Sequence, residues 1–214
     1  MNTFIEIPPT KRALSNRKLL FGHGINDAEY MTATTIDGEC IVCPFYRVWA
    51  SMFRRCYSKV FHKTHPTYID CSVSKEWHLF SNFKKWMETQ KWQGKDLDKD
   101  IIKPNNKIYS AENCVFVSHK INSLLSDNAS SSGLPKGVCF HKASNKYVSY
   151  CSVDGYRNHL GCFDTPKEAS KVYRKFKSNI VLEIAKKQTD PRIKKGLLLH
   201  AEIIGNPYCT ERSI

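Results

Sequence analysis

Residues 136–163 alternate apolar and polar side chains in three short runs, and this two-residue period is typical of strands that bury one face. The runs are KGVCFH, KYVSYCSV and YRNHLGCF, separated by the turn sequences KASN and DG. Asp154-Gly155 favours a tight hairpin because both turn positions tolerate positive φ. The segment therefore predicts a three-stranded antiparallel sheet.

The sequence TPKE follows the third run and predicts the start of a helix. Thr165 can serve as the N-cap, Pro166 stands at the first helical position, and Glu168 can complete a reciprocal capping box. The helix must bury its apolar stripe on one face of the sheet and leave the other face open. The stripe comprises Ala169, Val172, Tyr173, Phe176 and Ile180.

An open, basic sheet face suits a polyanionic partner. The chain has 33 Lys and Arg against 20 Asp and Glu, with 18 against 13 in residues 1–135 and 15 against 7 in residues 136–214. A ribbon of strands can enter the major groove of DNA, where Arg and Lys bind guanine edges and phosphates. The alternative is a small α+β module whose basic face is only solvated. The predicted DNA-contacting residues are Lys136, His141, Lys142, Lys146, Tyr147, Tyr150, Arg157 and His159, of which His141, Tyr147 and His159 have no assigned facing.

The first half of the chain predicts two amphipathic helices after an irregular basic arm at residues 1–43. One helix begins at Pro44, and the other begins near Ser74, a plausible cap. Helical spacing accounts for the apolar side chains of both, so we expect these side chains in a core. They are Phe45, Val48, Trp49, Met52 and Cys56 in the first helix, and Trp77, Phe80, Phe83 or Lys84, and Met87 in the second.

Residues 95–125 predict a strand, a loop, a second strand and a helix, with the strands at Asp98–Ile102 and Cys114–Val117 and Ser118 as the helix cap. Alternate residues of a strand share a face, so Asp98 and Asp100 are expected to point together. Two carboxylates near an Asn and a His are suitable ligands for Mg²⁺. The alternative is that both are exposed residues paired with nearby lysines.

The stretches LDKDI, NKIYSAENCVFVS and IN, with YRVWASMFRRCYS, PTYIDCSVSKEW and FSNFKKWM ahead of them, resemble the HNH-like region of phage HNH homing endonucleases. The resemblance covers residues 44–125 and implies a ββα nuclease unit. By position, Asn113 would be the central Asn, His119 or Asn122 would be the helix ligand, and Asp98, Asp100 and Asn122 would hold Mg²⁺.

One position departs from this family's pattern. Active members have an Asp-His pair where this chain has Asp98-Lys99, and a protonated Lys cannot accept a proton from water near neutral pH. Either His119 serves as the catalytic base together with Asn113 and Asp98, or the unit binds DNA without cutting it.

KGV at 136–138 and HLGCFDTPKEASKVY at 159–173 resemble the AP2 DNA-binding domain, which in phages is often attached to HNH nucleases. This resemblance implies DNA binding through the sheet. Plant members commonly carry Arg where this chain has Cys139 and Trp where it has Tyr147. The resemblance therefore supports affinity for DNA more than any particular sequence preference.

Together these patterns predict an α+β protein: an arm at 1–43, an HNH-like domain at 44–125, a linker at 126–135, an AP2-like domain at 136–189, and a C-terminal helix and tail at 190–214, capped by Asp190. The expected function is binding of double-stranded DNA, with metal-dependent nicking or cleavage directed by the AP2-like domain. The alternatives are a DNA-binding regulator without nuclease activity and a phage inhibitor that binds a host protein.

The nine cysteines are expected to be free thiols in the cytoplasm of an infected bacterium, where disulfides do not persist. Cys40 and Cys43 have the spacing of a zinc knuckle, but no second close Cys or His pair follows, so zinc is not expected. No apolar run approaches the roughly 18 residues that cross a bilayer, and neither a signal peptide nor a membrane partner is expected.

Overall fold

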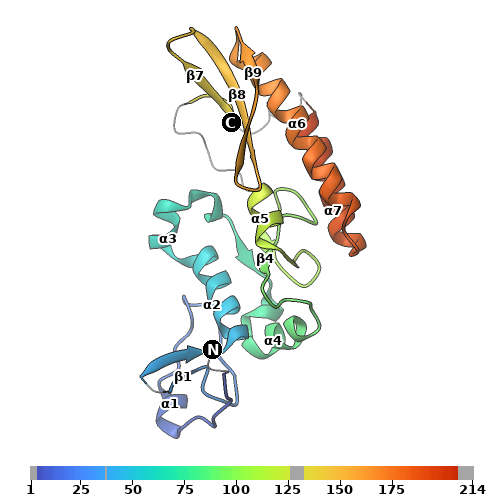
Figure 1. The fold of residues 1–214 in the computed structure, drawn as a ribbon. Coiled ribbons are helices and arrows are strands. Elements are labelled where there is room, and N and C mark those ends of the chain that lie inside the picture. The colour runs from blue at the N-terminus through green and yellow to red at the C-terminus, as the bar shows by residue number, and fades with distance from the viewer. Residues whose placement is uncertain (1–3, 37, 126–132, 207–214) are drawn as a thin grey trace. The chain divides into compact units, whose positions relative to one another are not determined.

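The computed structural model describes residues 4–36, 38–125 and 133–206 and confirms the α+β class (Figure 1). Internal contacts divide the chain into two units, 1–117 and 118–214, and each is described by itself. The sequence placed the end of the first domain at residue 125, whereas α5 (His119–Leu125) falls in the second unit. Residues 126–132, most of the predicted linker, lie outside the described residues.

Residues 4–36 and 38–42, which the sequence predicted as an irregular arm, are regular only in part. They contain α1 (Lys11–Ser15) and an antiparallel hairpin of β1 (Ala33–Ile36) and β2 (Glu39–Val42). Thr10 caps α1 by accepting a hydrogen bond from the amide of Ala13 at 3.1 Å. The guanidinium of Arg17 donates to three backbone carbonyls, those of Asn26, Ala28 and Tyr30, at 2.7–3.0 Å, and so holds the segment that leads into the hairpin.

The helix predicted from Pro44 is confirmed as α2 (Pro44–Tyr57), which α3 (Lys59–Thr64) and a 3-10 turn, η1 (Pro66–Tyr68), follow. The second predicted helix is divided into a 3-10 turn, η2 (Lys75–His78), and α4 (Phe80–Glu88). The division has a tertiary cause, because Ile25 donates to the carbonyl of His78 and accepts from the amide of Phe80. This pairing holds Leu79 extended between the two helices.

The core of the first unit is aromatic and lies among α2, η2 and α4. Trp49, Phe53, Phe80 and Phe83 are fully buried, and the indole of Trp49 donates to the carbonyl of Trp77 at 2.7 Å. Helical spacing assigned Trp49, Phe80 and Phe83 to a core, and their burial confirms that assignment. Phe45 and Val48 are only partly buried, and Phe53 was not among the predicted core residues.

Four short strands complete the first unit. β3 (Ser72–Val73) pairs in parallel with β5 (Ile108–Tyr109), and β4 (Asp96–Asp98) pairs antiparallel with β6 (Val115–Val117). The prediction of a strand at 98–102 is wrong, because β4 already ends at Asp98. One carboxylate oxygen of Asp98 accepts hydrogen bonds from the amides of Asp100 and Ile101, and these bonds turn the chain. Such a side-chain turn competes with strand pairing.

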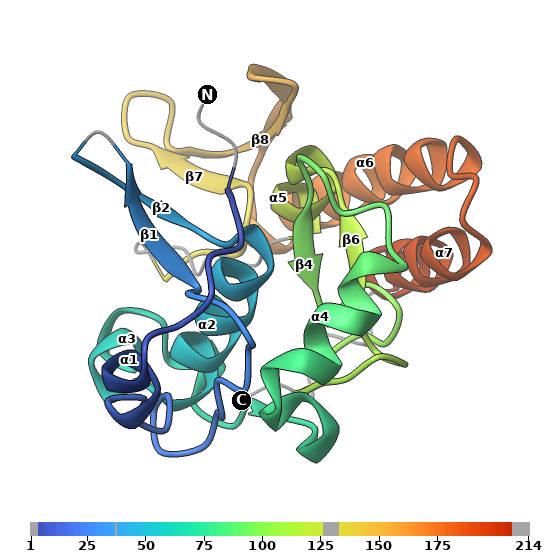
Figure 2. The same cartoon turned by 90° about the horizontal axis from the view of Figure 1, so that it is seen from below.

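The second unit contains the predicted three-stranded sheet, in the order β7 (Val138–His141), β8 (Lys146–Val153) and β9 (Tyr156–Phe163). α6 (Pro166–Lys186) follows with both bonds of the predicted capping box in place. α7 (Pro191–Gly205) begins after the predicted cap, Asp190, and packs alongside α6 as an antiparallel hairpin (Figure 2).

α6 covers one face of the sheet, and Gly137 explains how the helix approaches so closely. Gly137 has φ +76°, and a Cβ placed there would lie 2.1 Å from the ring of Tyr173 on α6. On β8, Ser149 and Cys151 are buried on the covered face. The glycine of the KGV stretch is thus required by packing of the sheet against the helix.

The cysteines that the structure describes are free, as expected, and five of the eight are buried. Burial raises the pKa of the thiols of Cys56 and Cys114 to about 12, so neither forms a thiolate near neutral pH. Within the described ranges, no helix has the length and apolar character to cross a bilayer.

Candidate nucleic-acid interface

The uncovered face of the sheet is identified by the alternation of side chains along β8. Lys146, Val148, Tyr150 and Ser152 share one face, opposite to that of Ser149 and Cys151. On this face Val148 is buried, Lys146 and Tyr150 are partly exposed, and Ser152 is exposed. Residues paired directly across the strands share a face with their partners. The outer face therefore also carries Cys139, His141, Arg157, His159 and Cys162.

Tyr150 is at the centre of a cluster on this outer face. The guanidinium carbon of Arg157 lies 3.9 Å from the centroid of the Tyr150 ring, and the ring of His159 packs edge-on at 5.3 Å. Arg157 and His159 are both exposed. Stacking on an aromatic ring restrains a guanidinium while the N–H donors at its rim stay available for ligands. The cluster thus presents a pre-ordered arginine to solvent.

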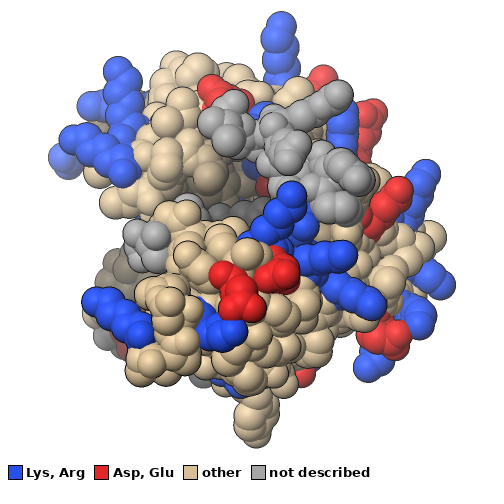
Figure 3. All heavy atoms as spheres, turned by 90° about the horizontal axis from the view of Figure 1, so that it is seen from above, with Lys and Arg blue, Asp and Glu red and all other residues tan. Residues whose placement is uncertain are grey.

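The remaining basic groups of this face lie along its edges. Lys146 forms an ion pair with Asp164 at 2.5 Å, and this partner raises the pKa of the ammonium, so Lys146 is charged throughout the physiological range. The exposed His141 accepts from or donates to the hydroxyl of Ser144 through Nδ1 at 2.9 Å. Lysine and arginine side chains also stand out at several places on the molecular face drawn in Figure 3.

The structure separates the predicted contact residues into two groups. His141, Lys146, Tyr150, Arg157 and His159 lie together on the outer face, which settles the facing of both histidines.

Tyr147 lies on the opposite face, where its ring contacts that of Phe140 at 5.1 Å. Lys142 is exposed in the turn after β7, and Lys136 precedes that strand. Sequence reasoning missed Cys139, Ser152 and Cys162 on the outer face, although counting alternate residues from Tyr150 would have found Ser152.

The HNH-like region contains a buried ion pair at the position where the sequence departs from the family's pattern. The Lys99 ammonium donates to both carboxylate oxygens of Asp100 at 2.7 Å and to the carbonyl of Asn106 at 2.8 Å. Its side chain is 7% exposed and lies 5.8 Å from the ring centroids of both Tyr68 and Tyr109. Burial lowers the pKa of Lys99, but Asp100 more than offsets this, and the net pKa is raised. Lys99 is therefore a fixed cation and cannot act as a general base.

The candidate metal ligands do not form a common site within one unit. The side-chain amide of Asn113 donates to the carbonyl of Ile108 at 3.4 Å, and His119 and Asn122 belong to α5 in the second unit. Among the described residues, no group of three or more His, Cys, Asp or Glu side chains is arranged to hold a metal ion.

Asp98 and Asp100 also differ from the expected pair. β4 ends at Asp98, so the two carboxylates do not alternate on one strand, and Asp100 is matched in charge by Lys99. Burial raises the pKa of Asp98, although the amides of Ile101 and Asp100 partly oppose this effect. Asp98 and Asp100 therefore do not form the expected pair of carboxylates on one strand face, and the alternative, pairing with a nearby lysine, describes Asp100.

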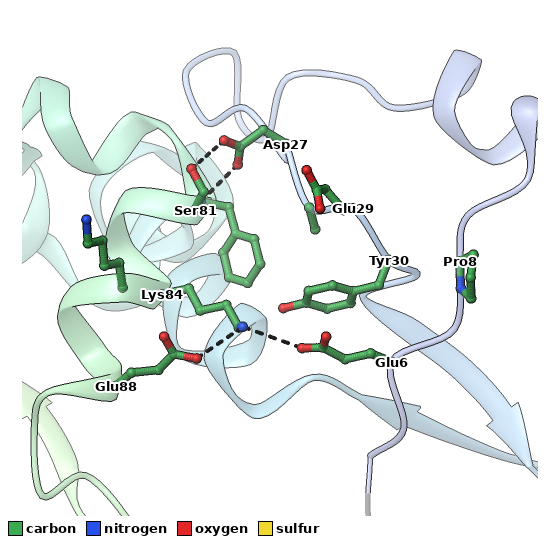
Figure 4. Close-up of a pocket in the computed structure, with 11 residues that line it drawn as sticks. Glu6, Pro8, Asp27, Glu29, Tyr30, Ser81, Lys84 and Glu88 are labelled. Atoms are coloured by element: carbon green, nitrogen blue, oxygen red, sulfur yellow. Dashed lines mark hydrogen bonds and ion pairs between the residues drawn. The ribbon is translucent and has the colours of Figure 1, made fainter.

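A pocket of about 640 Å³ in the first unit lies between the N-terminal segment and α4 (Figure 4). The ammonium of Lys84 projects into it and pairs with Glu88 at 3.1 Å and Glu6 at 3.4 Å. On another side, the carboxylate of Asp27 accepts from the amide and hydroxyl of Ser81 at 2.8 and 2.5 Å. The Glu6–Lys84 and Asp27–Ser81 pairs join the N-terminal segment to α4, whereas Lys84–Glu88 lies within the helix.

Comparisons with known proteins found no family model, no curated protein and no solved structure that matches the chain.

Proposed function

We propose that this protein binds double-stranded DNA through the outer face of the β7–β9 sheet and that it holds DNA without cutting it. The observation that supports binding most directly is the Arg157–Tyr150–His159 cluster on a solvent-exposed sheet face. The net charge of +13 supplies a general attraction to a polyanion.

The geometry of the sheet suits the major groove. The groove is about 12 Å wide and admits a small ribbon of strands. Arg157, restrained on Tyr150, can donate to the O6 and N7 atoms of guanine, while Lys146 at the edge of the sheet can contact a phosphate. Lys146 must exchange part of its pairing with Asp164 for the phosphate contact, and both side chains are exposed enough to do so.

The state of Lys99 supports binding without cleavage. A nuclease of the expected kind needs a base near the scissile phosphate and carboxylates available to a divalent cation. Here Lys99 stands where the base is expected and neutralises Asp100. The first unit then serves as a stable scaffold, and the protein acts by remaining bound to DNA, as a DNA-binding regulator without nuclease activity would.

Fluorescence anisotropy with a labelled duplex tests the binding face. Replacement of the two outer cations, Lys146→Gln with Arg157→Gln, should weaken binding about tenfold or more, because each contact contributes roughly 1–3 kcal/mol. The matched control, Lys171→Gln with Lys175→Gln, removes equal charge from exposed positions of α6 and should bind as the natural protein does. Equal weakening by both pairs would contradict a specific role for the sheet.

The same samples test for cleavage on supercoiled plasmid with Mg²⁺ or Mn²⁺. We expect retardation of the plasmid without nicking. Metal-dependent nicking that disappears in Asp98→Ala with Asp100→Ala would establish the nuclease and overturn binding without cleavage. A natural protein with no affinity for DNA would instead favour the host-protein inhibitor.

A further inference from the structure

The turn between α6 and α7 concentrates positive charge. Residues 186–195, KKQTDPRIKK, contain five cations and a single acid, Asp190. The cations are all exposed, and they are Lys186, Lys187, Arg192, Lys194 and Lys195. This group, called here the hairpin cluster, lies outside the face assigned to DNA above.

Helix electrostatics account for only part of this cluster. Lys186 and Lys187 lie at the C-terminal end of α6, where the helix dipole favours cations, and Lys186 also pairs with Glu183 at 2.6 Å. Three further cations lie in the first turns of α7, whose first turn contains no acidic residue. The positive end of the helix dipole disfavours a cation in this first turn, and the effect falls off beyond it, so the dipole does not account for the cations at the start of α7.

The one acid of the turn is already engaged. Asp190 caps α7 by accepting from the amides of Arg192 at 2.8 Å and Ile193 at 3.5 Å. Its carboxylate serves the helix start and cannot neutralise the whole cluster.

The hairpin that carries the cluster is firmly packed. Ser178 on α6 donates to the carbonyl of Ala201 on α7 at 2.7 Å, and Val181 and Leu197 are fully buried. The apolar residue of the turn, Ile193, is also buried. The surface of the turn is therefore charged and polar, whereas protein interfaces are depleted in lysine and centre on apolar or aromatic contacts. Lysines on a fixed scaffold match a phosphate backbone better than a protein partner.

We propose that the hairpin cluster binds the phosphate backbone of a second DNA segment, so that one chain holds two duplexes. This proposal rests on the proposed function for the first duplex.

The cluster lies at the far end of α6 from the sheet: the helix has 21 residues, which span about 32 Å at roughly 1.5 Å per residue. α6 also covers the sheet face opposite to the one assigned to DNA. A duplex is stiff over such lengths, so a segment in contact with the sheet cannot bend back to the cluster at low cost.

Two short duplexes, one with a donor dye and one with an acceptor dye, test this proposal with the full chain. The natural protein should bring the dyes together, and sedimentation should find one chain with two duplexes, which separates bridging by one chain from bridging by a dimer. The hairpin variant, Lys187→Gln, Lys194→Gln and Lys195→Gln, should lose bridging about tenfold or more, while binding of the first duplex persists. The matched control, Lys167→Gln, Lys171→Gln and Lys175→Gln, should bridge normally.

Thermal unfolding checks that the hairpin variant folds. Its midpoint should stay close to that of the natural protein, because the loss of Lys187 at the C-terminal end of α6 opposes the relief of repulsion at the start of α7. Bridging by the hairpin variant at the level of the control would overturn the proposal, and so would a natural protein that binds only one duplex. If Lys146→Gln with Arg157→Gln left binding intact while the hairpin variant lost it, the sheet would be the wrong surface. The cluster would then be the first DNA site, and the proposal that one chain holds two duplexes would be overturned.

Discussion

At the scale of single residues, Lys99 shows how one substitution in a recognisable pattern changes the chemistry of a site. Its ammonium is buried and bonded to Asp100 and to the Asn106 carbonyl. Lys99→Met should lower the free energy of unfolding by about 2–3 kcal/mol, because the Asn106 carbonyl loses its donor and the Asp100 carboxylate loses its cation. The half-exposed position of Asp100 limits the loss, since water can solvate that carboxylate. Urea denaturation followed by tryptophan fluorescence measures the effect.

Asp98→Asn is the matched control at the neighbouring position. The pKa of Asp98 is raised in the folded state, so the folded protein binds this proton more tightly than the unfolded chain does. Stability from this group is therefore greatest at low pH and decreases as pH rises through the folded pKa. A neutral Asn can still accept from both amides, and at pH 7 we expect little loss. A loss in Asp98→Asn as large as that in Lys99→Met would refute the assignment of Lys99 as the key group.

At the scale of elements, the start of α6 is stabilised by a reciprocal cap. The amide of Glu168 donates to the Thr165 hydroxyl at 3.2 Å, and the Thr165 amide donates to the Glu168 carboxylate at 3.2 Å. Thr165→Ala should lower the stability of the second unit by about 1 kcal/mol, and by 2 at most. Far-UV circular dichroism during urea unfolding measures this loss of stability. Thr189→Ala, an exposed threonine ahead of the α7 cap, should leave the midpoint unchanged.

At the scale of the whole molecule, each unit has its own core, and the tryptophans mark only one of them. Trp49, Trp77, Trp86 and Trp92 all belong to unit 1–117. Phe83→Ala, at a fully buried position of the first unit, should cost about 3–5 kcal/mol there. In this variant we expect the urea midpoint measured by tryptophan fluorescence, which reports on the first unit, to fall. The urea midpoint measured by the helix signal of the second unit should not change. Coincident shifts of both signals would mean that the units unfold as one body.

Signals local in the sequence were sufficient to predict most of the secondary structure of the second unit. The hairpin at Asp154-Gly155, the cap at Thr165 and the start of α7 at Asp190 each depend on residues within a few positions of one another, and the structure contains all three. The outer face also follows from alternation along β8 once one residue is placed. Tyr147 lies three residues before Tyr150 on β8, and an odd separation along a strand places the two side chains on opposite faces, so Tyr147 is not on the outer face.

Long-range contacts decided what the sequence could not. Leu79 divides a predicted helix because Ile25, more than fifty residues earlier, pairs with its neighbours. β4 stops at Asp98, and Lys99 lies buried among groups from other segments, including Tyr68 and Asn106. Periodicity and caps report interactions within a few residues along the chain, so the sequence by itself determined the α+β class and the architecture of the second unit. Only the tertiary structure decided that Lys99 is buried, because its burial depends on which distant segments, such as the one carrying Tyr68, pack around it.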